Sequence, residues 1–227
     1  MNQRQVRIIE LKESILKNND ADADALREET KRSHLSYVNV MSSPGSGKTT
    51  AILALLRALQ GDLRCGVCEA DIDSDVDART VLAAGFPAVQ LHTGGMCHLD
   101  AQMSRQGLSA LGTKDLDCVI LENVGNLVCP AEFDTGADLN LVILSVPEGD
   151  DKPLKYPLVF ARADAVLVNK MDALPAFDFS LEKCTENIRL RNADIPVFPI
   201  SARTGEGIPE AAAFVRRHVE ERISDLS

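Results

Sequence analysis

The stretch SSPGSGKTT, Ser42 to Thr50, decides the fold class. An apolar run, YVNVM (37–41), leads into it, and a helical pattern, TTAILALLRALQ, follows it. A glycine-rich turn between a strand and a helix is the context of a phosphate-binding loop, in which backbone N–H groups surround phosphate oxygens. Ser42 replaces the usual first glycine of this motif, but the residues that build the anion nest, Pro44 to Thr49, are present. A turn that merely caps a helix is the alternative, and this context disfavours it.

The loop predicts both phosphate and magnesium binding. Lys48 is placed to reach the β- and γ-phosphates, and the Thr49 hydroxyl is placed to bind Mg²⁺. We therefore expect the phosphates to contact six consecutive residues: Gly45, Ser46, Gly47, Lys48, Thr49 and Thr50.

Short apolar runs alternate with helical patterns along the rest of the chain. The expected strands are 37–41, 65–70, 88–92, 117–122, 139–146, 165–170 and 196–200. Strands that are apolar on both faces and separated by helices predict a parallel sheet that is covered on both sides. The predicted fold is therefore an α/β P-loop NTPase, with a mostly parallel sheet and helices on both faces.

The first 35 residues differ from the remainder. Val6, Ile8, Ile9, Leu11, Ile15, Leu16 and Leu26 recur at roughly helical spacing among many charges, and a polar segment, NNDADADALREETKRSH, follows most of them. This pattern predicts an amphipathic helical arm over residues 1–35, followed by a GTP-binding domain over residues 36–227.

Composition limits the classes of partner. The chain has 227 residues, of which 34 are acidic and 24 basic, for a net charge of −10. Without a basic stripe, such a chain repels a phosphate backbone, so no nucleic-acid partner is expected. No apolar run approaches the roughly 18 residues of a membrane span, and the N-terminus does not resemble a signal peptide. A cytoplasmic protein is expected, in which the six cysteines are mostly thiols.

The base is indicated by Asn169-Lys170-Met171-Asp172. This motif is similar to the NKxD signature of GTP-binding proteins, in which the aspartate accepts hydrogen bonds from guanine and the lysine stem covers the ring. Adenine lacks both donors. Ser201-Ala202-Arg203 resembles the second guanine loop of those proteins. The two motifs together predict GTP and GDP as ligands.

Acidic residues between these motifs are candidates for Mg²⁺ and water. EADIDSDVDA carries Asp71, Asp73, Asp75 and Asp77, and Glu122 ends the run DCVILE. About half of the four aspartates are expected only to cap a helix or face solvent. Mg²⁺ takes few protein ligands, so Thr49 with one or two carboxylates suffices, and Asp71, Asp77 and Glu122 are the candidates. The predicted catalytic residues are Lys48, Thr49, Asp77 and Glu122.

Two further stretches carry thiols beside expected strand ends. GGMCHLDA contains Cys97 and His98, and ENVGNLVCPAEFD leads from Glu122 to Cys129. Loops at strand carboxyl ends share one rim of the sheet, so these three side chains can converge near the nucleotide. Two thiolates and an imidazole suit Zn²⁺ or Ni²⁺, but three ligands are one short of a structural zinc site, so a two-fold mate is expected to complete the set.

These motifs, together with EGDDKPLKYP (148–157), closely resemble the hydrogenase nickel-incorporation GTPases, the HypB-type accessory proteins of NiFe-hydrogenase maturation. The resemblance implies a slow GTPase that acts as a metallochaperone and dimerises with nucleotide. It implies that Cys97, His98 and Cys129 bind nickel or zinc at the dimer interface, and that Asp77 and Glu122 belong to the Mg²⁺ shell. It also implies a nickel-donating or nickel-accepting maturation protein and the hydrogenase large-subunit precursor as partners. Many bacterial members carry an N-terminal cysteine or histidine motif that is absent here.

Two other functions stay open. A urease-accessory GTPase is disfavoured because that family presents Cys-Pro-His where this chain has Cys97-His98-Leu99. A signalling GTPase with structural thiols is the other alternative. The thiols Cys65, Cys68, Cys118 and Cys184 are expected in the core, since residues i and i+3 of a strand face opposite sides.

Overall fold

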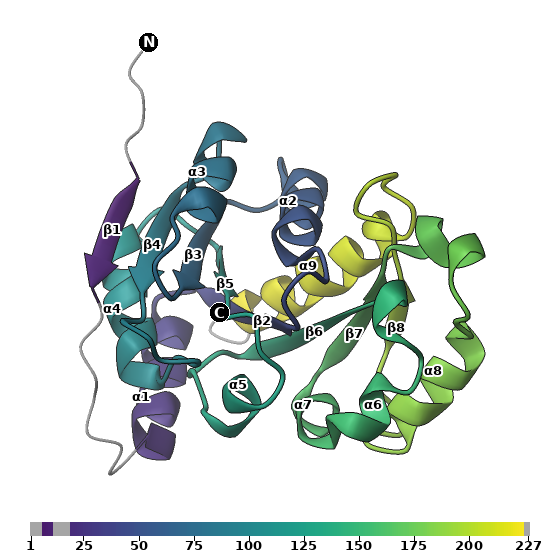
Figure 1. Cartoon of the computed structure of the whole chain (residues 1–227). Helices are drawn as coiled ribbons and strands as arrows, with labels where there is room; N and C mark the ends of the chain where they lie inside the picture. Colours follow the sequence, from purple (N-terminus) through teal and green to yellow (C-terminus); the bar gives the residue numbers. More distant parts are fainter. Residues whose placement is uncertain (1–5, 11–18, 225–227) are drawn as a thin grey trace.

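A computed structural model describes residues 6–10 and 19–224 (Figure 1). Its strands form one parallel sheet in the order β1-β4-β3-β5-β2-β6-β7-β8. Their bounds are β1 (Arg7–Glu10), β2 (Ser36–Ser42), β3 (Cys65–Asp71), β4 (Ala88–His92), β5 (Cys118–Glu122), β6 (Leu139–Ser145), β7 (Ala165–Asn169) and β8 (Val197–Pro199). The predicted α/β fold with a parallel sheet is confirmed, and each strand expected from residue 37 onward is present.

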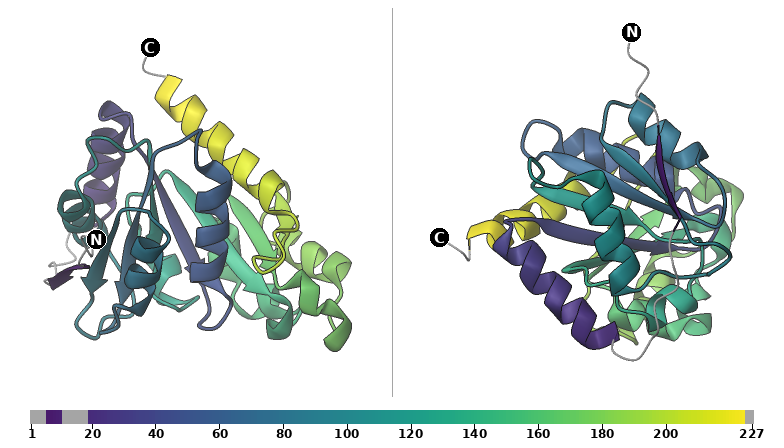
Figure 2. Two further views of the ribbon diagram at one scale, coloured as in Figure 1. Left: turned by 90° about the horizontal axis from the view of Figure 1, so that it is seen from above. Right: turned by 90° about the vertical axis from the view of Figure 1, so that its left-hand side faces the viewer.

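Helices cover both faces of the sheet (Figure 2). One face packs against α2 (Lys48–Leu59), α3 (Val76–Ala83) and α9 (Ile208–Ser224). The other packs against α1 (Asn19–Arg32), α4 (Ala101–Leu111), α5 (Cys129–Glu132), α7 (Pro157–Arg162) and α8 (Leu181–Arg189). The short α6 (Lys152–Lys155) adjoins α7 and α8, and the 3₁₀ helices η1 (Val146–Glu148) and η2 (Met171–Ala176) follow β6 and β7. None of the described helices is long and apolar enough to span a membrane.

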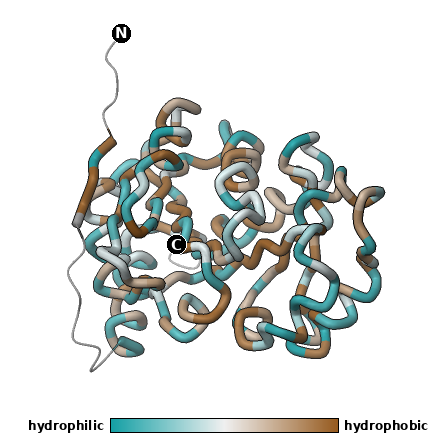
Figure 3. Tube along the Cα trace, viewed as in Figure 1, coloured by the Kyte–Doolittle hydropathy of each residue, from teal (hydrophilic) through white to brown (hydrophobic). Residues whose placement is uncertain are grey.

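The strand sequences explain this layering. Side chains alternate between the two faces of a strand. Val38 and Val40 of β2 pack toward α2 and α9, whereas Tyr37 and Met41 pack toward the opposite helices. All of β2 is buried, and the residues that pack against the helices on its two faces are apolar, whereas Ser36, Asn39 and Ser42 are buried polar residues. Figure 3 shows hydrophobic stretches in the interior of the molecule.

The N-terminal region departs from its prediction. Residues Arg7–Glu10 are a strand, β1, which pairs in parallel with β4 at the sheet edge, so the helix expected there is wrong. The expected arm does contain a helix, α1, but it lies in the polar segment that follows most of the apolar residues. Leu26 of α1 is buried in the core beside α4, and this tertiary contact stabilises a helix with few apolar residues. Leu11, Ile15 and Leu16 lie outside the described residues, and the boundary near residue 35 stays a prediction.

Candidate nucleotide and metal site

The phosphate loop lies between β2 and α2, as predicted. Gly45 and Gly47 have φ angles of 76° and 86°, a left-handed conformation that favours glycine. Helix α2 begins at Lys48, so the free N–H groups of its first turn face the loop. Ser46 is buried and Thr50 is exposed in the first turn of the helix. The loop therefore has the backbone that an anion-binding nest requires.

A cleft of about 470 Å³ adjoins this loop. Thr49 Oγ1 donates a hydrogen bond of 2.8 Å to Glu122 Oε1, and Lys48 Nζ lies 3.5 Å from the same oxygen. Asp71 and Asp77 also line the cleft. The predicted phosphate and Mg²⁺ residues are thus brought together at the carboxyl ends of β2, β3 and β5.

The aspartates after β3 divide into different roles. Asp71 Oδ1 accepts hydrogen bonds from the backbone N–H groups of residues 73 and 74, which orders the turn. Asp75 pairs with Arg79 at 2.6 Å within α3. Asp77, in contrast, joins Glu122 in a compact acidic cluster. The contacts of Asp71 and Asp75 are of the structural kind that we expect for about half of these aspartates.

Glu69 is a site residue that the sequence analysis missed. Ligand atoms of Glu69, Asp77 and Glu122 all lie within 4.8 Å of one another, and no other such group of three or more was found among the described residues. Burial, together with the neighbouring Glu122, raises the pKa of the Glu69 carboxyl well above its usual value. The available signal was a glutamate inside the otherwise apolar strand CGVCEAD. We refer to Glu69, Asp77 and Glu122 below as the carboxylate cluster.

The base-binding motifs lie next to the phosphate loop. Asn169, at the end of β7, donates from Nδ2 to the Ser46 carbonyl at 3.0 Å, and its Oδ1 accepts from the Ala202 N–H at 3.1 Å. Lys170 Nζ donates to the Gly45 carbonyl at 2.6 Å. A single buried asparagine thus connects three loops that are far apart in the sequence.

The Asp172 carboxylate contacts two hydrogen-bond donors. Ser201 Oγ donates to Oδ1 at 2.6 Å, and Arg203 Nη2 lies 2.6 Å from Oδ2. The hydrogen bond from Ser201 and the charge of Arg203 lower the pKa of Asp172. The carboxylate is therefore ionised at neutral pH, as an acceptor for guanine N–H groups must be.

The thiol candidates lie on two neighbouring loops. Cys97 Sγ is 3.9 Å from His98 Nδ1, and the His98 ring stacks on Phe133, with centroids 3.6 Å apart. Phe133 caps the short helix that Cys129 begins. Hydrogen bonding with Cys129, followed by burial, raises the pKa of Cys97, which reflects the proximity of the two thiols. Both are partly exposed, whereas Cys65, Cys68, Cys118 and Cys184 are buried, as expected.

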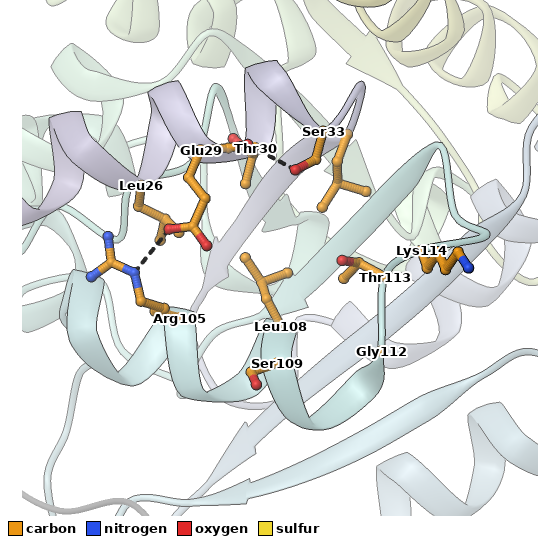
Figure 4. Close-up of a pocket in the computed structure, with 11 residues that line it drawn as sticks. Leu26, Glu29, Thr30, Ser33, Arg105, Leu108, Ser109, Gly112, Thr113 and Lys114 are labelled. Atoms are coloured by element: carbon orange, nitrogen blue, oxygen red, sulfur yellow. Dashed lines mark hydrogen bonds and ion pairs between the residues drawn. The ribbon is translucent and has the colours of Figure 1, made fainter.

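A second hollow lies between α1 and α4, and none of the motif residues lines it (Figure 4). Its volume is about 680 Å³, and Leu26, Leu108, Thr113 and Lys114 are among the residues that line it. An ion pair of 3.1 Å between Glu29 and Arg105 lies at its edge. This groove is larger than the nucleotide cleft, so volume alone does not identify the functional site.

Comparisons with known proteins point to one family. Residues 36–199 match the model of the CobW/HypB/UreG nucleotide-binding domain. The hydrogenase maturation factor HypB of Azotobacter chroococcum is 44% identical over 219 residues, which cover 96% of this chain and 72% of that protein. The hydrogenase/urease maturation factor HypB of Helicobacter hepaticus is 42% identical over 221 residues, 96% of this chain and 89% of that protein.

Solved structures give the same result. The crystal structure of HypB from Helicobacter pylori in complex with nickel superposes with a TM-score of 0.85 at 37% identity, and the match covers 91% of this chain and 97% of that one. HypB from Archaeoglobus fulgidus matches with a TM-score of 0.83 at 34% identity, over 90% of this chain and 100% of that one.

Proposed function

Because the chain belongs to the CobW/HypB/UreG family and, within it, to the HypB hydrogenase maturation factors, we propose that it is a GTP-hydrolysing metallochaperone that delivers nickel to a NiFe hydrogenase. GTP is its substrate, Mg²⁺ its cofactor and nickel its cargo, with zinc as a competing ion at the same ligands. We propose that Cys97, His98 and Cys129 bind the cargo, and that nucleotide controls their assembly.

One observation supports this coupling most directly: the segment from Glu122 to Cys129 lies against the phosphate loop. Asn126 forms an isolated β-bridge with Ser42, just before that loop. A Cβ atom added to Gly125 would lie 3.2–3.4 Å from three atoms of Pro44. A change in the phosphate loop therefore acts directly on the segment that ends at Cys129.

The residues of the cleft fit phosphoryl transfer to water. Lys48 would bind the β- and γ-phosphates in place of its present contact with Glu122, and the Thr49 hydroxyl and Glu122 would hold Mg²⁺ and its water. When bound, Mg²⁺ neutralises charge that develops on the phosphates. Asp77 and Glu122 would orient the attacking water. Turnover should be slow because, in the part of the chain that the structure describes, no arginine lines the cleft.

Guanine selection would come from Asp172. Its ionised oxygens can accept hydrogen bonds from guanine N1–H and the exocyclic amine. Asn169 hydrogen-bonds to both the phosphate loop and the second guanine loop and so fixes their relative position. Lys170 already lies over the phosphate loop, where its stem can cover the ring. Ser201, Ala202 and the arginine that follows them would complete the base pocket.

Exposed apolar residues beside the thiols support a homodimer. Val128 is 49% exposed immediately before Cys129, and Leu154 and Leu158 are 43% and 41% exposed on α6 and α7. A groove of about 380 Å³, lined in part by Val128, Lys152 and Tyr156, lies between this loop and α6. A second copy that covers these side chains would bring a second set of thiols to the same axis.

The remaining partners follow from the family. We propose that the chain acts in the cytoplasm with a nickel-donating or nickel-accepting maturation protein and with the hydrogenase large-subunit precursor. Relatives in Helicobacter carry the name hydrogenase/urease maturation factor, so a urease is the second candidate target.

Anaerobic nickel titration tests the proposal. The protein is titrated with Ni²⁺ while bound to GDP or to a non-hydrolysable GTP analogue, and we expect tighter binding with the analogue. Cys129→Ala should remove most nickel binding and leave nucleotide affinity unchanged, whereas the matched variant Cys65→Ala, at a buried thiol, should retain both. Equal nickel affinity in the two nucleotide states, or full binding by Cys129→Ala, would contradict the proposal.

A further inference from the structure

We infer that the carboxylate cluster of Glu69, Asp77 and Glu122 is a divalent-cation site that fills with Mg²⁺ or Mn²⁺ in the absence of nucleotide. The inference deepens the proposed function because the cluster lies in the nucleotide cleft. It differs from a cation held between Thr49 and a phosphate, since its ligands all come from carboxylates of this chain.

The sheet positions two of the three carboxylates. Glu69 of β3 and Glu122 of β5 are register partners on adjacent parallel strands, so their side chains point to the same face. That face is the one under α2, because Val67 and Ile120, two residues earlier on each strand, pack in the core with α2. Asp77, in the first turn of α3, supplies the third carboxylate.

Buried oxygens of this cluster lack partners. Glu69 and Glu122 are 3% and 1% exposed. Their Oε2 atoms are fully buried, and neither has a hydrogen-bond partner among the described residues. The other oxygen of Glu122 is already used by Thr49 and Lys48. Buried acceptors without donors are costly, and a cation between them would satisfy both.

Charge leads to the same conclusion. Three carboxylates lie within 4.8 Å of one another, and Lys48 is the only cation that forms an ion pair with any of them in the described part of the chain. With all three carboxylates ionised, Lys48 balances one negative charge, and the two positive charges of a divalent ion would balance the other two.

The ligand set selects the class of ion. Mg²⁺ binds oxygen at 2.0–2.1 Å in octahedral geometry, so two ligands lie at most about 4.2 Å apart. Three ligands of one such ion include at least two cis pairs, which lie about 2.9 Å apart. The present atoms, all within 4.8 Å of one another, would therefore close around the ion by up to about 2 Å. Carboxylates without imidazole or thiolate suit Mg²⁺ and Mn²⁺ and do not favour Ni²⁺, so this site is separate from that of the cargo.

The role of Thr49 separates the two sites. Its hydroxyl donates a hydrogen bond to Glu122, and it would bind the cation only when the phosphates of a nucleotide also hold that ion. A cation already in the cleft would also offset the repulsion between the carboxylates and an incoming triphosphate. Glu69 is therefore expected to matter before nucleotide binds, and Thr49 after it binds.

The test is Mn²⁺ binding to nucleotide-free protein. Binding is measured by electron paramagnetic resonance as the loss of the signal of free Mn²⁺. We expect one site in the wild type and weakening by at least about tenfold in Glu69→Gln. Asp73→Asn, an exposed acid of the same loop, is the matched control and should bind as the wild type does. Thr49→Ala should keep nucleotide-free binding within a few fold. As a second readout, Mg²⁺ should raise the Tm of the nucleotide-free wild type and of Asp73→Asn, but not that of Glu69→Gln.

Each result has a definite meaning. No Mn²⁺ binding by nucleotide-free wild type would overturn the inference and leave a shared proton between Glu69 and Glu122. If Thr49→Ala and Glu69→Gln lost Mn²⁺ affinity equally, the inference would also be overturned, because the ion would then bind at the phosphate-loop threonine. GDP binding in EDTA is measured on every variant: retained GDP binding in Glu69→Gln shows that the cleft is folded, whereas a wild type that does not bind GDP refutes the proposed function instead.

Discussion

Replacing Asn169 with alanine should weaken guanine-nucleotide binding although the side chain belongs to neither the phosphate loop nor the second guanine loop. The change removes two hydrogen bonds, of 3.0 Å to the Ser46 carbonyl and 3.1 Å from the Ala202 N–H. Each contributes about 0.5–1.5 kcal/mol net, and together they contribute about 1–3 kcal/mol. If this free energy holds the loops in their binding geometry, GDP affinity should fall about 5–150-fold.

The assay is calorimetric titration of GDP into wild type, Asn169→Ala and a matched control. Asn192→Ala is that control, because Asn192 also donates one partly buried side-chain bond, to the Ala163 carbonyl at 3.1 Å, away from the site. It should lose some stability but no GDP affinity. An Asn169→Ala protein that binds GDP within twofold of the wild type would refute the bridging role.

Four other outcomes follow from the site. Asp172→Asn should weaken GTP by two or more orders of magnitude and improve binding of xanthosine triphosphate, since two charge-assisted bonds of about 1.5–3 kcal/mol each are lost; competition binding measures both. Lys48→Ala should abolish GTP hydrolysis, measured as phosphate release, and a wild-type rate would show that the loop is misassigned. The pKa of Asp172 is lowered, so its ionised form persists as pH falls, and GDP affinity should hold down to about pH 4. Ser201→Ala removes the main cause of that shift, so its loss of affinity should begin at higher pH; superimposable profiles would contradict the assignment.

Most of the fold was predictable because its signals are local. Strands β2 to β7 are mostly apolar and buried, and the phosphate loop fixes the order strand, loop, helix around residue 45. The wrong prediction of a helix at residues 7–10 has a nonlocal cause. Ile8 and Ile9 lie in a strand only because β4 offers a free edge, and nothing near them in the sequence encodes that partner.

Helix α1 lies within the helical arm expected over residues 1–35, but in its polar part, where the sequence pattern is weakest. Among its described residues only Ala23, Leu26 and Thr30 are buried, too few to mark a helical face in the sequence. Its position depends on contacts made elsewhere, among them the ion pair of Arg27 with Asp134 and that of Glu29 with Arg105. Such pairs connect residues far apart in the chain and have no local signature.

The site residues also divide into those with a local sequence signal and those that depend on distant contacts. Motifs with a fixed spacing predicted Lys48, Thr49, Asn169 and Asp172 as site residues. Glu69 belongs to no motif: its sequence signal is only a glutamate inside an expected strand, and the strand register is what places it beside Glu122. For Cys97, His98 and Cys129, the sequence predicted a shared rim of the sheet. In the described chain their ligand atoms do not form a compact group of the kind that the carboxylates form. In the proposed function, a second subunit completes this metal site.

The central claim is that nucleotide and metal act on one dimer, and sedimentation velocity tests it most directly. Wild type and Cys129→Ala are compared as apo protein, with a GTP analogue, with Ni²⁺ and with both. If ligands are shared across a two-fold axis, metal must promote dimerisation by the same factor by which dimerisation tightens metal binding. We expect the dimer constant of the wild type to be highest with both ligands, and the metal effect to be absent in Cys129→Ala. Equal dimer constants in all four wild-type states would contradict the coupling.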